Sequence, residues 1–101
     1  MNARNKRASL TEFRTQLLCV LYDCRPLALS LDTLVIRIRR RIPEAEKKQL
    51  PPEVTYFMDK GYIVEERDTL SPGLVSYRLH ASGVDYLERQ CWRWLADREQ
   101  E

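Results

Sequence analysis

The sequence lacks the features that mark several classes of protein. No apolar run approaches the roughly 20 residues that cross a bilayer, so no membrane span is expected. The basic residues 1–7 are followed by an apolar stretch that Glu12, Arg14 and Gln16 interrupt, so we also expect no signal peptide. Charged residues (32%) and hydrophobic residues (44%) are too balanced for a disordered chain, and 101 residues suit one domain. We therefore expect a cytoplasmic protein that does not bind membranes.

Side chains suited to metal binding or catalysis are scarce. The chain has one histidine, His80, and its three cysteines, Cys19, Cys24 and Cys91, have no CxxC spacing. A structural zinc site needs four ligands in recognisable pairs, so we expect no metal and reduced, buried cysteines. There is also no glycine-rich phosphate loop and no grouping of nucleophile, base and acid. The sequence therefore predicts a protein that is not an enzyme, with no cofactor and no small-molecule substrate.

The charge is unevenly distributed along the chain. The net charge is only +2, yet residues 1–42 carry a balance of +6 and residues 43–101 a balance of −4. Thirteen of the seventeen cations are arginine, whose guanidinium makes bidentate contacts with phosphate or carboxylate groups. This asymmetry favours a polyanionic partner, although a solvated charged surface explains the same pattern.

The first predicted helix begins at a capping box, Ser9-Leu10-Thr11-Glu12, in which Ser9 accepts from the backbone of Glu12. Arg25-Pro26 ends it, because a residue before proline is biased away from helical angles. Between these limits apolar residues recur at helical spacing. They are Phe13, Leu17, Val20, Leu21 and Cys24.

The segment Leu27–Leu29 is too short for a helix and is either a brief edge strand or an extended linker. Ser30 is the N-cap of a second helix, which Pro43 stops. A polar connection, Glu44–Gln49, precedes the third helix, in whose first turn Pro51 and Pro52 are acceptable. The apolar residues of helix two are Leu31, Leu34, Val35, Ile38 and Ile42, and those of helix three are Leu50, Val54, Phe57 and Met58.

The hydrophobic period changes after Gly61, which we expect to end the third helix in a left-handed turn. Residues 62–67 and 75–79 are β-prone, and residues 68–73 are rich in turn formers, so a β-hairpin is predicted. A last amphipathic helix follows. Its apolar residues are Val84, Leu87, Cys91, Trp94 and Leu95. We thus predict a mostly α, α+β domain over residues 9–96, between a basic arm (1–8) and a charged tail (97–101).

Two stretches, Phe57–Glu65 and Tyr77–Leu87, carry a family resemblance. The first is similar to the part of the winged helix-turn-helix superfamily in which a helix end and a glycine precede an aliphatic strand. The second is similar to the Tyr-Arg-Leu-Thr-x-x-Gly motif that opens the last helix of the same superfamily. The likeness is greatest to small bacterial and phage regulators of the PadR, MarR and ArsR kind, and His80 stands where those have Thr or Ser. The resemblance implies a three-helix core, a β-hairpin wing and a C-terminal helix. The same residues also have a purely architectural interpretation, in which Gly83 allows a close approach of helix to sheet.

In that superfamily the third helix usually enters the major groove of double-stranded DNA, and the wing contacts the phosphate backbone. The resemblance therefore implies a set of DNA-binding residues, namely Arg37, Arg40, Arg41, Lys47, Lys48, Gln49, Thr55, Tyr56, Lys60, Arg67 and Arg78. Arg39 can join the second-helix group, and Arg4, Lys6 and Arg7 can follow a duplex. Glu53 and Asp59 count against groove binding, because a carboxylate beside a phosphate is repelled. The second-helix arginines are alternatively a solvated face paired with Glu44, Glu46 or Asp32, and the arm alternatively has no role.

The last helix carries more apolar area than one terminal helix needs, which favours a homodimer formed through the first and last helices. The predicted interface residues are Tyr86, Cys91, Trp92, Trp94 and Leu95. Alternatively the two tryptophans cover the core of the domain. We predict a small DNA-binding transcriptional regulator of phage or mobile-element origin. The alternative is a winged-helix interaction or assembly module that does not recognise specific DNA sequences.

Overall fold

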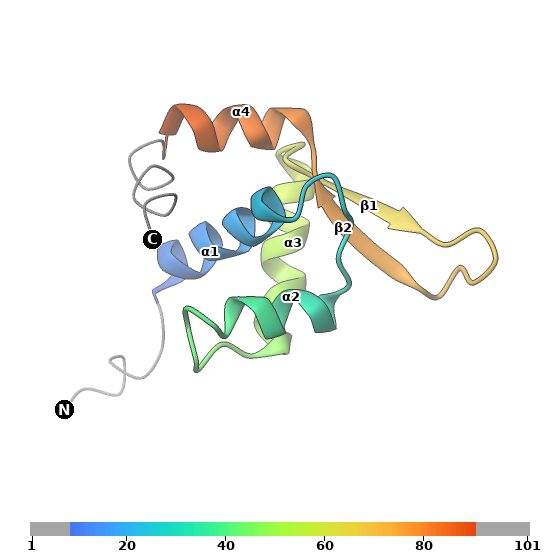
Figure 1. Cartoon of the computed structure of the whole chain (residues 1–101), viewed down its shortest axis with the longest axis horizontal. Coiled ribbons are helices and arrows are strands. Elements are labelled where there is room, and N and C mark those ends of the chain that lie inside the picture. The colour runs from blue at the N-terminus through green and yellow to red at the C-terminus, as the bar shows by residue number, and fades with distance from the viewer. Residues whose placement is uncertain (1–8, 91–101) are drawn as a thin grey trace.

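The structure is a computed structural model that describes residues 9–90. It is a mixed α+β fold, mostly helical, in which four α-helices and one two-stranded antiparallel hairpin have the order expected of a winged helix (Figure 1). The hairpin projects from one end of the helical body, and α4 runs along one side of that body (Figure 1). The elements are α1 (Leu10–Asp23), α2 (Leu31–Ile38), the 3₁₀ helix η2 (Lys47–Gln49), α3 (Leu50–Asp59), β1 (Ile63–Arg67), β2 (Val75–Leu79) and α4 (Ala81–Gln90).

Both serine caps form as the sequence predicts. The Ser9 hydroxyl accepts from the backbone N–H of Glu12 at 3.0 Å, and the Ser30 hydroxyl accepts from that of Thr33 at 3.2 Å. Each cap satisfies a donor that the first turn of a helix leaves without an intrahelical partner. The starts of α1 and α2 are therefore determined locally.

Helix α2 ends at Ile38, earlier than the stop at Pro43 that the sequence predicts. The N–H groups of Arg40 and Arg41 bond three residues back, to Arg37 and Ile38, so the chain tightens into turns. Ile42 nevertheless stays buried, and so does Ala45 in the connection that was expected to be polar. The segment after α2 therefore belongs to the core although it is not helical.

Helix α3 ends as the glycine predicts. Gly61 has a φ of +80°, a conformation that side chains with a Cβ rarely adopt. Its N–H bonds to the carbonyl of Met58, and the N–H of Tyr62 bonds to that of Phe57, both at 2.9 Å, which is a Schellman motif. Because Tyr62 uses its N–H in this cap, β1 begins one residue later than predicted, at Ile63.

The hairpin pairs Ile63 with Leu79 at its base and Arg67 with Val75 near its tip. Leu29 exchanges two backbone hydrogen bonds with Tyr77, at 2.7 and 2.8 Å, so the segment before α2 adds one bridge to the edge of β2. Residues 27 and 28 form no β pairing, so the segment is extended and only Leu29 pairs as an edge strand would. The hairpin is thereby joined to the helical body.

One hydrophobic core holds these elements together. Helix α1 is the most deeply embedded element, with six buried residues. Leu18 is among them, although it was not placed on the predicted apolar stripe of this helix, and Cys19 is buried as expected. The fully buried side chains of the core include Leu17, Cys19, Leu21, Leu34, Ile38, Leu50 and Leu87.

Candidate nucleic-acid interface

Helix α3 presents one face to the core and another to solvent. Leu50, Val54 and Phe57 are buried, and Thr55 and Asp59 are exposed. Thr55 lies one turn before Asp59, so the two share one side of the helix. Of the residues that the resemblance assigns to DNA, Thr55 is thus exposed on this side of the helix.

Glu53 does not lie on that exposed side. Its carboxylate accepts from Nε of Arg14 in α1 at 2.6 Å, and only 13% of its side chain is exposed. The expectation that Glu53 is an acid facing the DNA groove is therefore wrong. The interaction that turns Glu53 inward joins residues 39 positions apart, so the local pattern gave no signal of it. Asp59 remains as the exposed acid of α3.

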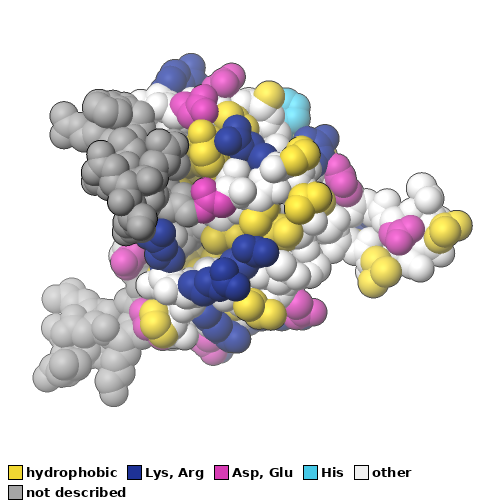
Figure 2. All heavy atoms as spheres, viewed as in Figure 1, with side chains coloured by type: hydrophobic (Ala, Val, Ile, Leu, Met, Phe, Trp, Pro, Cys, Tyr) yellow, Lys and Arg dark blue, Asp and Glu magenta, His cyan; other side chains and the backbone are white. Residues whose placement is uncertain are grey.

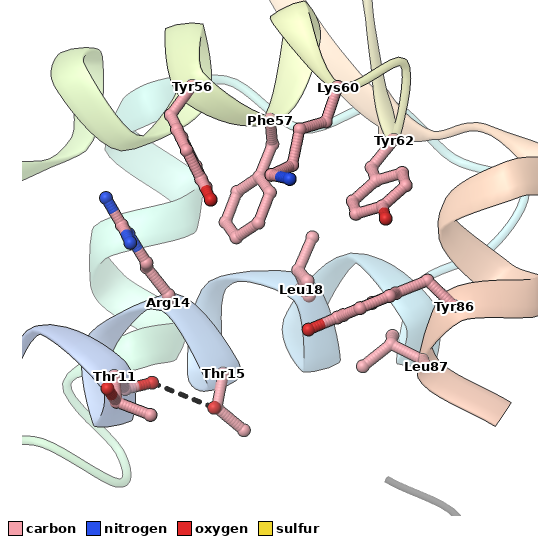
Figure 3. Close-up of a pocket in the computed structure, with 10 residues that line it drawn as sticks. All are labelled: Thr11, Arg14, Thr15, Leu18, Tyr56, Phe57, Lys60, Tyr62, Tyr86 and Leu87. Carbon is pink, nitrogen blue, oxygen red and sulfur yellow. Dashed lines mark hydrogen bonds between the residues drawn. The ribbon is translucent and has the colours of Figure 1, made fainter. Parts of the chain in front are cut away.

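Tyr56 and Lys60 lie on the flank of α3 that faces α1 and α4 (Figure 3). The Arg14 guanidinium lies 4.1 Å from the centre of the Tyr56 ring, and the Lys60 amine lies 5.3 Å from it. Together with residues of α1 and α4, they line a pocket of about 260 Å³. The structure therefore separates Tyr56 and Lys60 from Thr55, although all three were predicted to bind DNA.

Each of the two lysines before α3 lies near a carboxylate. Lys47 binds the Asp32 carboxylate at 2.7 Å, and Lys48 lies 3.8 Å from Glu46, with most of its side chain exposed. Exposed pairs of this kind hold their partners weakly, so both amines stay available to an anion. The Gln49 side chain instead accepts from the backbone N–H of Glu46 at 2.7 Å and caps the turn.

Arg37, Arg40 and Arg41 gather on the other side of α2. They line a second pocket with residues of α1, among them Asp23. Lys and Arg side chains form a group over α1 and α2 on the face shown in Figure 2, whereas α3 lies behind these helices in the same view (Figure 1). Arg39 is not part of this second pocket, and its Nε donates to the carbonyl of Ala45 at 2.7 Å.

Two carboxylates that the sequence offered as partners for these arginines are paired elsewhere. Asp32 pairs with Lys47, and Glu46 with Lys48. The arginine cluster, meaning Arg37, Arg40 and Arg41, is exposed on the surface of the protein. It therefore forms a cationic area that is distinct from the exposed side of α3.

The wing carries little unopposed positive charge. Arg78 pairs with Glu66 across the hairpin, and Arg67 pairs with Glu65 at 2.9 Å and donates to the carbonyl of Pro72. Beyond these residues the tip is acidic and apolar on the face shown in Figure 2. The side chain of Leu70 is 91% exposed. Both predicted wing cations thus contact carboxylates of their own hairpin.

Of the predicted dimer interface, the structure describes Tyr86 alone. Its ring stacks on that of Tyr62 with centroids 4.8 Å apart, and it lines the pocket beside Tyr56 and Lys60. The other four predicted residues, Cys91, Trp92, Trp94 and Leu95, lie outside the described residues, as do the basic arm and the charged tail.

His80, which stands at the Thr or Ser position of the resemblance, acts in the turn before α4. Its Nδ1 accepts from the backbone N–H of Ser82 at 3.2 Å, and the Ser82 hydroxyl donates to the carbonyl of Gly61 at 2.6 Å. Histidine thus supplies the acceptor that a hydroxyl supplies at this kind of helix start.

Within residues 9–90, no three His, Cys, Asp or Glu side chains are grouped so that they could hold a metal ion. Cys19 is buried and Cys24 half-buried, and neither forms a disulfide. In the same part of the chain, no helix is long and apolar enough to pass through a bilayer.

No protein-family model and no curated protein matches the sequence. Among solved structures, the fold is similar to that of Bordetella bronchiseptica BpsR, with a TM-score of 0.58 and 15% sequence identity. The match covers 86% of this chain and 56% of the other, so the chain spans little more than half the length of that protein. BpsR is a protein whose DNA binding is regulated by 6-hydroxynicotinic acid. At this identity the likeness concerns the fold alone.

Proposed function

We propose that this chain is a winged-helix DNA-binding domain of a transcription regulator, and that the exposed side of α3 enters the major groove. The observation that carries the proposal is the Arg14–Glu53 pair, which removes one of two carboxylates from the surface that DNA would meet. Thr55 is then the polar contact at the centre of that surface. The likeness of the fold to that of BpsR, itself a DNA-binding protein, supports the proposal.

Phosphate contacts come from Lys47 and Lys48, which lie at the start of α3 in exposed, weak ion pairs. The arginine cluster lies on the α1 side of α2, so its part in the proposal is to contact flanking phosphates rather than bases. Each cation that neutralises a phosphate releases condensed counterions, so affinity falls as salt is raised. The homodimer through the first and last helices, the cytoplasmic location and the phage or mobile-element origin remain predictions.

The experiment measures binding of the full chain to a labelled random duplex over a series of salt concentrations. Binding that weakens steeply with salt is expected. The double variant Lys47→Ala/Lys48→Ala lowers both the affinity and the salt slope, the latter by about one for each phosphate that is no longer neutralised. Arg89→Ala, which removes an exposed cation from α4, is the matched control and leaves the slope unchanged.

A second candidate function is a winged-helix module that binds protein rather than DNA. The wing favours it, because Arg67 and Arg78 pair with carboxylates of the hairpin and Leu70 is exposed at the tip. Absence of duplex binding at the lowest salt concentration, with self-association seen by oligomer mass, would support this candidate and exclude the first.

A further inference from the structure

The two-stranded sheet of the wing has one open edge. Leu29 exchanges two backbone hydrogen bonds with Tyr77, so the outer side of β2 is occupied. Among residues 9–90, no strand or bridge lies on the other side of the sheet, beside β1. The hairpin projects from the helical body, which leaves its outer half away from the helices (Figure 1). β1 is therefore the edge through which another strand can join the sheet.

The hydrogen-bond pattern of the hairpin shows which backbone groups face this open edge. The N–H of Asp68 bonds to the carbonyl of Leu74 at 3.1 Å, so position 68 is bonded across the hairpin. Bonded and non-bonded positions alternate along an antiparallel ladder, so Glu66 is bonded to β2 as well. The N–H and C=O groups of Glu65 and Arg67 therefore point away from β2, and no described backbone group bonds to them.

The open edge lacks the features that usually keep other strands away. Natural edge strands carry proline, a bulge or charged side chains, lysine above all. β1 (Ile63–Arg67) contains no lysine and no proline, and its register with β2 runs without an extra residue. The two charged residues whose backbone faces the edge, Glu65 and Arg67, are of opposite sign and pair with each other at 2.9 Å. The edge therefore admits a strand of complementary charge.

We infer that β1 pairs antiparallel with β1 of a second copy of this chain, about a two-fold axis at Glu66. This axis sets Glu65 opposite the partner's Arg67. Because a two-fold contact repeats each pair, it also sets Arg67 opposite the partner's Glu65. The backbone groups of both residues face the edge, so each pair exchanges both of its hydrogen bonds. The strand is thus complementary to itself in backbone and in charge.

The charges favour this register over a neighbouring one. Each Glu65 keeps its own Arg67 and gains that of the other copy, so four charges of alternating sign form a network, which stabilises more than an isolated exposed pair. Glu66 meets its own copy at the axis, but it is already paired with Arg78 of β2, on the side away from the edge. An axis at Glu65 instead sets two Glu65 carboxylates opposite each other and Arg67 opposite Ile63, so like charges meet and no charge is matched.

The pairing joins two wings into one four-stranded antiparallel sheet. A lone two-stranded hairpin is marginally stable in water, and a third or fourth strand stabilises it. The contact uses neither α3 nor the first and last helices. It is therefore independent of the proposed DNA contact and of the predicted dimer through those helices, and it stands whether or not the chain binds duplex DNA.

Disulfide trapping of the full chain tests the pairing. In a Cys24→Ser/Cys91→Ser background, which leaves only the buried Cys19, the variant Glu66→Cys places one thiol at the axis. Opposite residues of a non-hydrogen-bonded pair lie close enough for a disulfide, so mild oxidation is expected to give a covalent dimer on a non-reducing gel. Gly73→Cys at the wing tip is the control and is expected to stay monomeric, because the two-fold axis sets the tips apart. No dimer with Glu66→Cys, or equal dimer with both variants, overturns the proposal.

Charge reversal in the Glu66→Cys protein tests the register and the identity of the partner. Glu65→Arg makes both edge charges positive and Arg67→Glu makes both negative, so each variant alone is expected to give about tenfold less covalent dimer. A mixture of the two variants restores the dimer, because every edge charge again meets its opposite, and mass spectrometry identifies the product as the heterodimer. Restored cross-linking also shows that both variants fold. A mixture that yields no more dimer than the separate variants refutes pairing in this register.

Discussion

Arg14 Nε and Glu53 Oε1 lie 2.6 Å apart and join the first helix to the third. The contact has two consequences. It orients the helix that we propose for DNA recognition, because it ties one side of α3 to α1. It also turns a carboxylate away from the surface that would meet DNA, so this surface is less acidic than the composition of α3 implies.

We expect Arg14→Met to lower the free energy of unfolding by about 1–3 kcal/mol, because it leaves the mostly buried Glu53 carboxylate without its donor. Chemical denaturation by urea, followed by circular dichroism, measures this. Lys48→Met is the matched control, since its pair with Glu46 spans 3.8 Å between exposed side chains and contributes less than about 1 kcal/mol. Equal losses in the two variants would contradict the importance of the α1–α3 pair.

Gly83→Ala is expected to destabilise the fold by about 1–3 kcal/mol, because its new Cβ meets the Tyr62 carbonyl oxygen at 2.6 Å and Leu79 Cδ1 at 2.7 Å. Neither neighbour can move freely, as one is backbone and the other is in the core. Gly73→Ala in the wing is the control, where nothing lies within 4 Å, and its stability stays within about 0.5 kcal/mol of the wild type. Thermal and urea unfolding of both variants provide the comparison.

Tyr22 gives a pH dependence at the contact between α1 and α4. Its hydroxyl donates to Glu88 at 2.8 Å, and this hydrogen bond, followed by partial burial, raises the pKa of Tyr22 above its ordinary value of 10.0. A pKa that is higher in the folded state gives stability that is present in full below the unfolded pKa and is lost as the pH rises through the folded one. The wild type therefore loses more stability than Tyr22→Phe as the pH rises above about 9.

The measurement is urea unfolding of the wild type and Tyr22→Phe at a series of alkaline pH values. All other tyrosines are common to the two proteins, so the difference between the curves reports Tyr22. Parallel curves would show that the Glu88 contact does not persist in solution.

The two cationic areas should contribute unequally to DNA binding. Lys47 and Lys48 stand at the start of α3, whereas Arg37 and Arg40 lie on the side of α2 that faces α1. We expect Lys47→Ala/Lys48→Ala to reduce the affinity for duplex more than Arg37→Ala/Arg40→Ala, because the lysines lie nearer the proposed recognition helix. Fluorescence anisotropy at fixed salt compares the two pairs. A larger loss of affinity in the arginine variant would mean that DNA lies across α1 and α2 instead.

The features predicted correctly are those that depend on near neighbours in the chain. Ser9 and Ser30 cap the helices that follow them, and Gly61 ends α3 with a positive φ. The turn formers at 68–73 lie between β1 and β2, as predicted. Gly83 packs closely against the sheet, as its position after the hairpin indicates. The caps, the helix end and the turn each rest on a hydrogen bond or steric limit that acts within a few residues.

The candidate site was predicted only in part, since it depends on which sides of α1, α3 and α4 meet. Nothing within α3 indicates that Glu53 pairs with Arg14, or that Tyr56 and Lys60 line a pocket with α1 and α4 whereas Thr55 does not. Helical periodicity places residues around an axis, but their partners come from elements distant in sequence. For the same reason the arginines of α2 and of the turns after it could be counted in advance but not assigned to the side facing α1.

The sequence by itself determined where the first two helices begin, where α3 ends and which segments pair as a hairpin, because caps, glycine and alternation act locally. Tertiary structure alone decided which charges are neutralised and which tyrosines enclose a pocket. The Arg14–Glu53 pair and the pocket both depend on contacts between side chains that are tens of residues apart, and burial of one shared core sets those contacts.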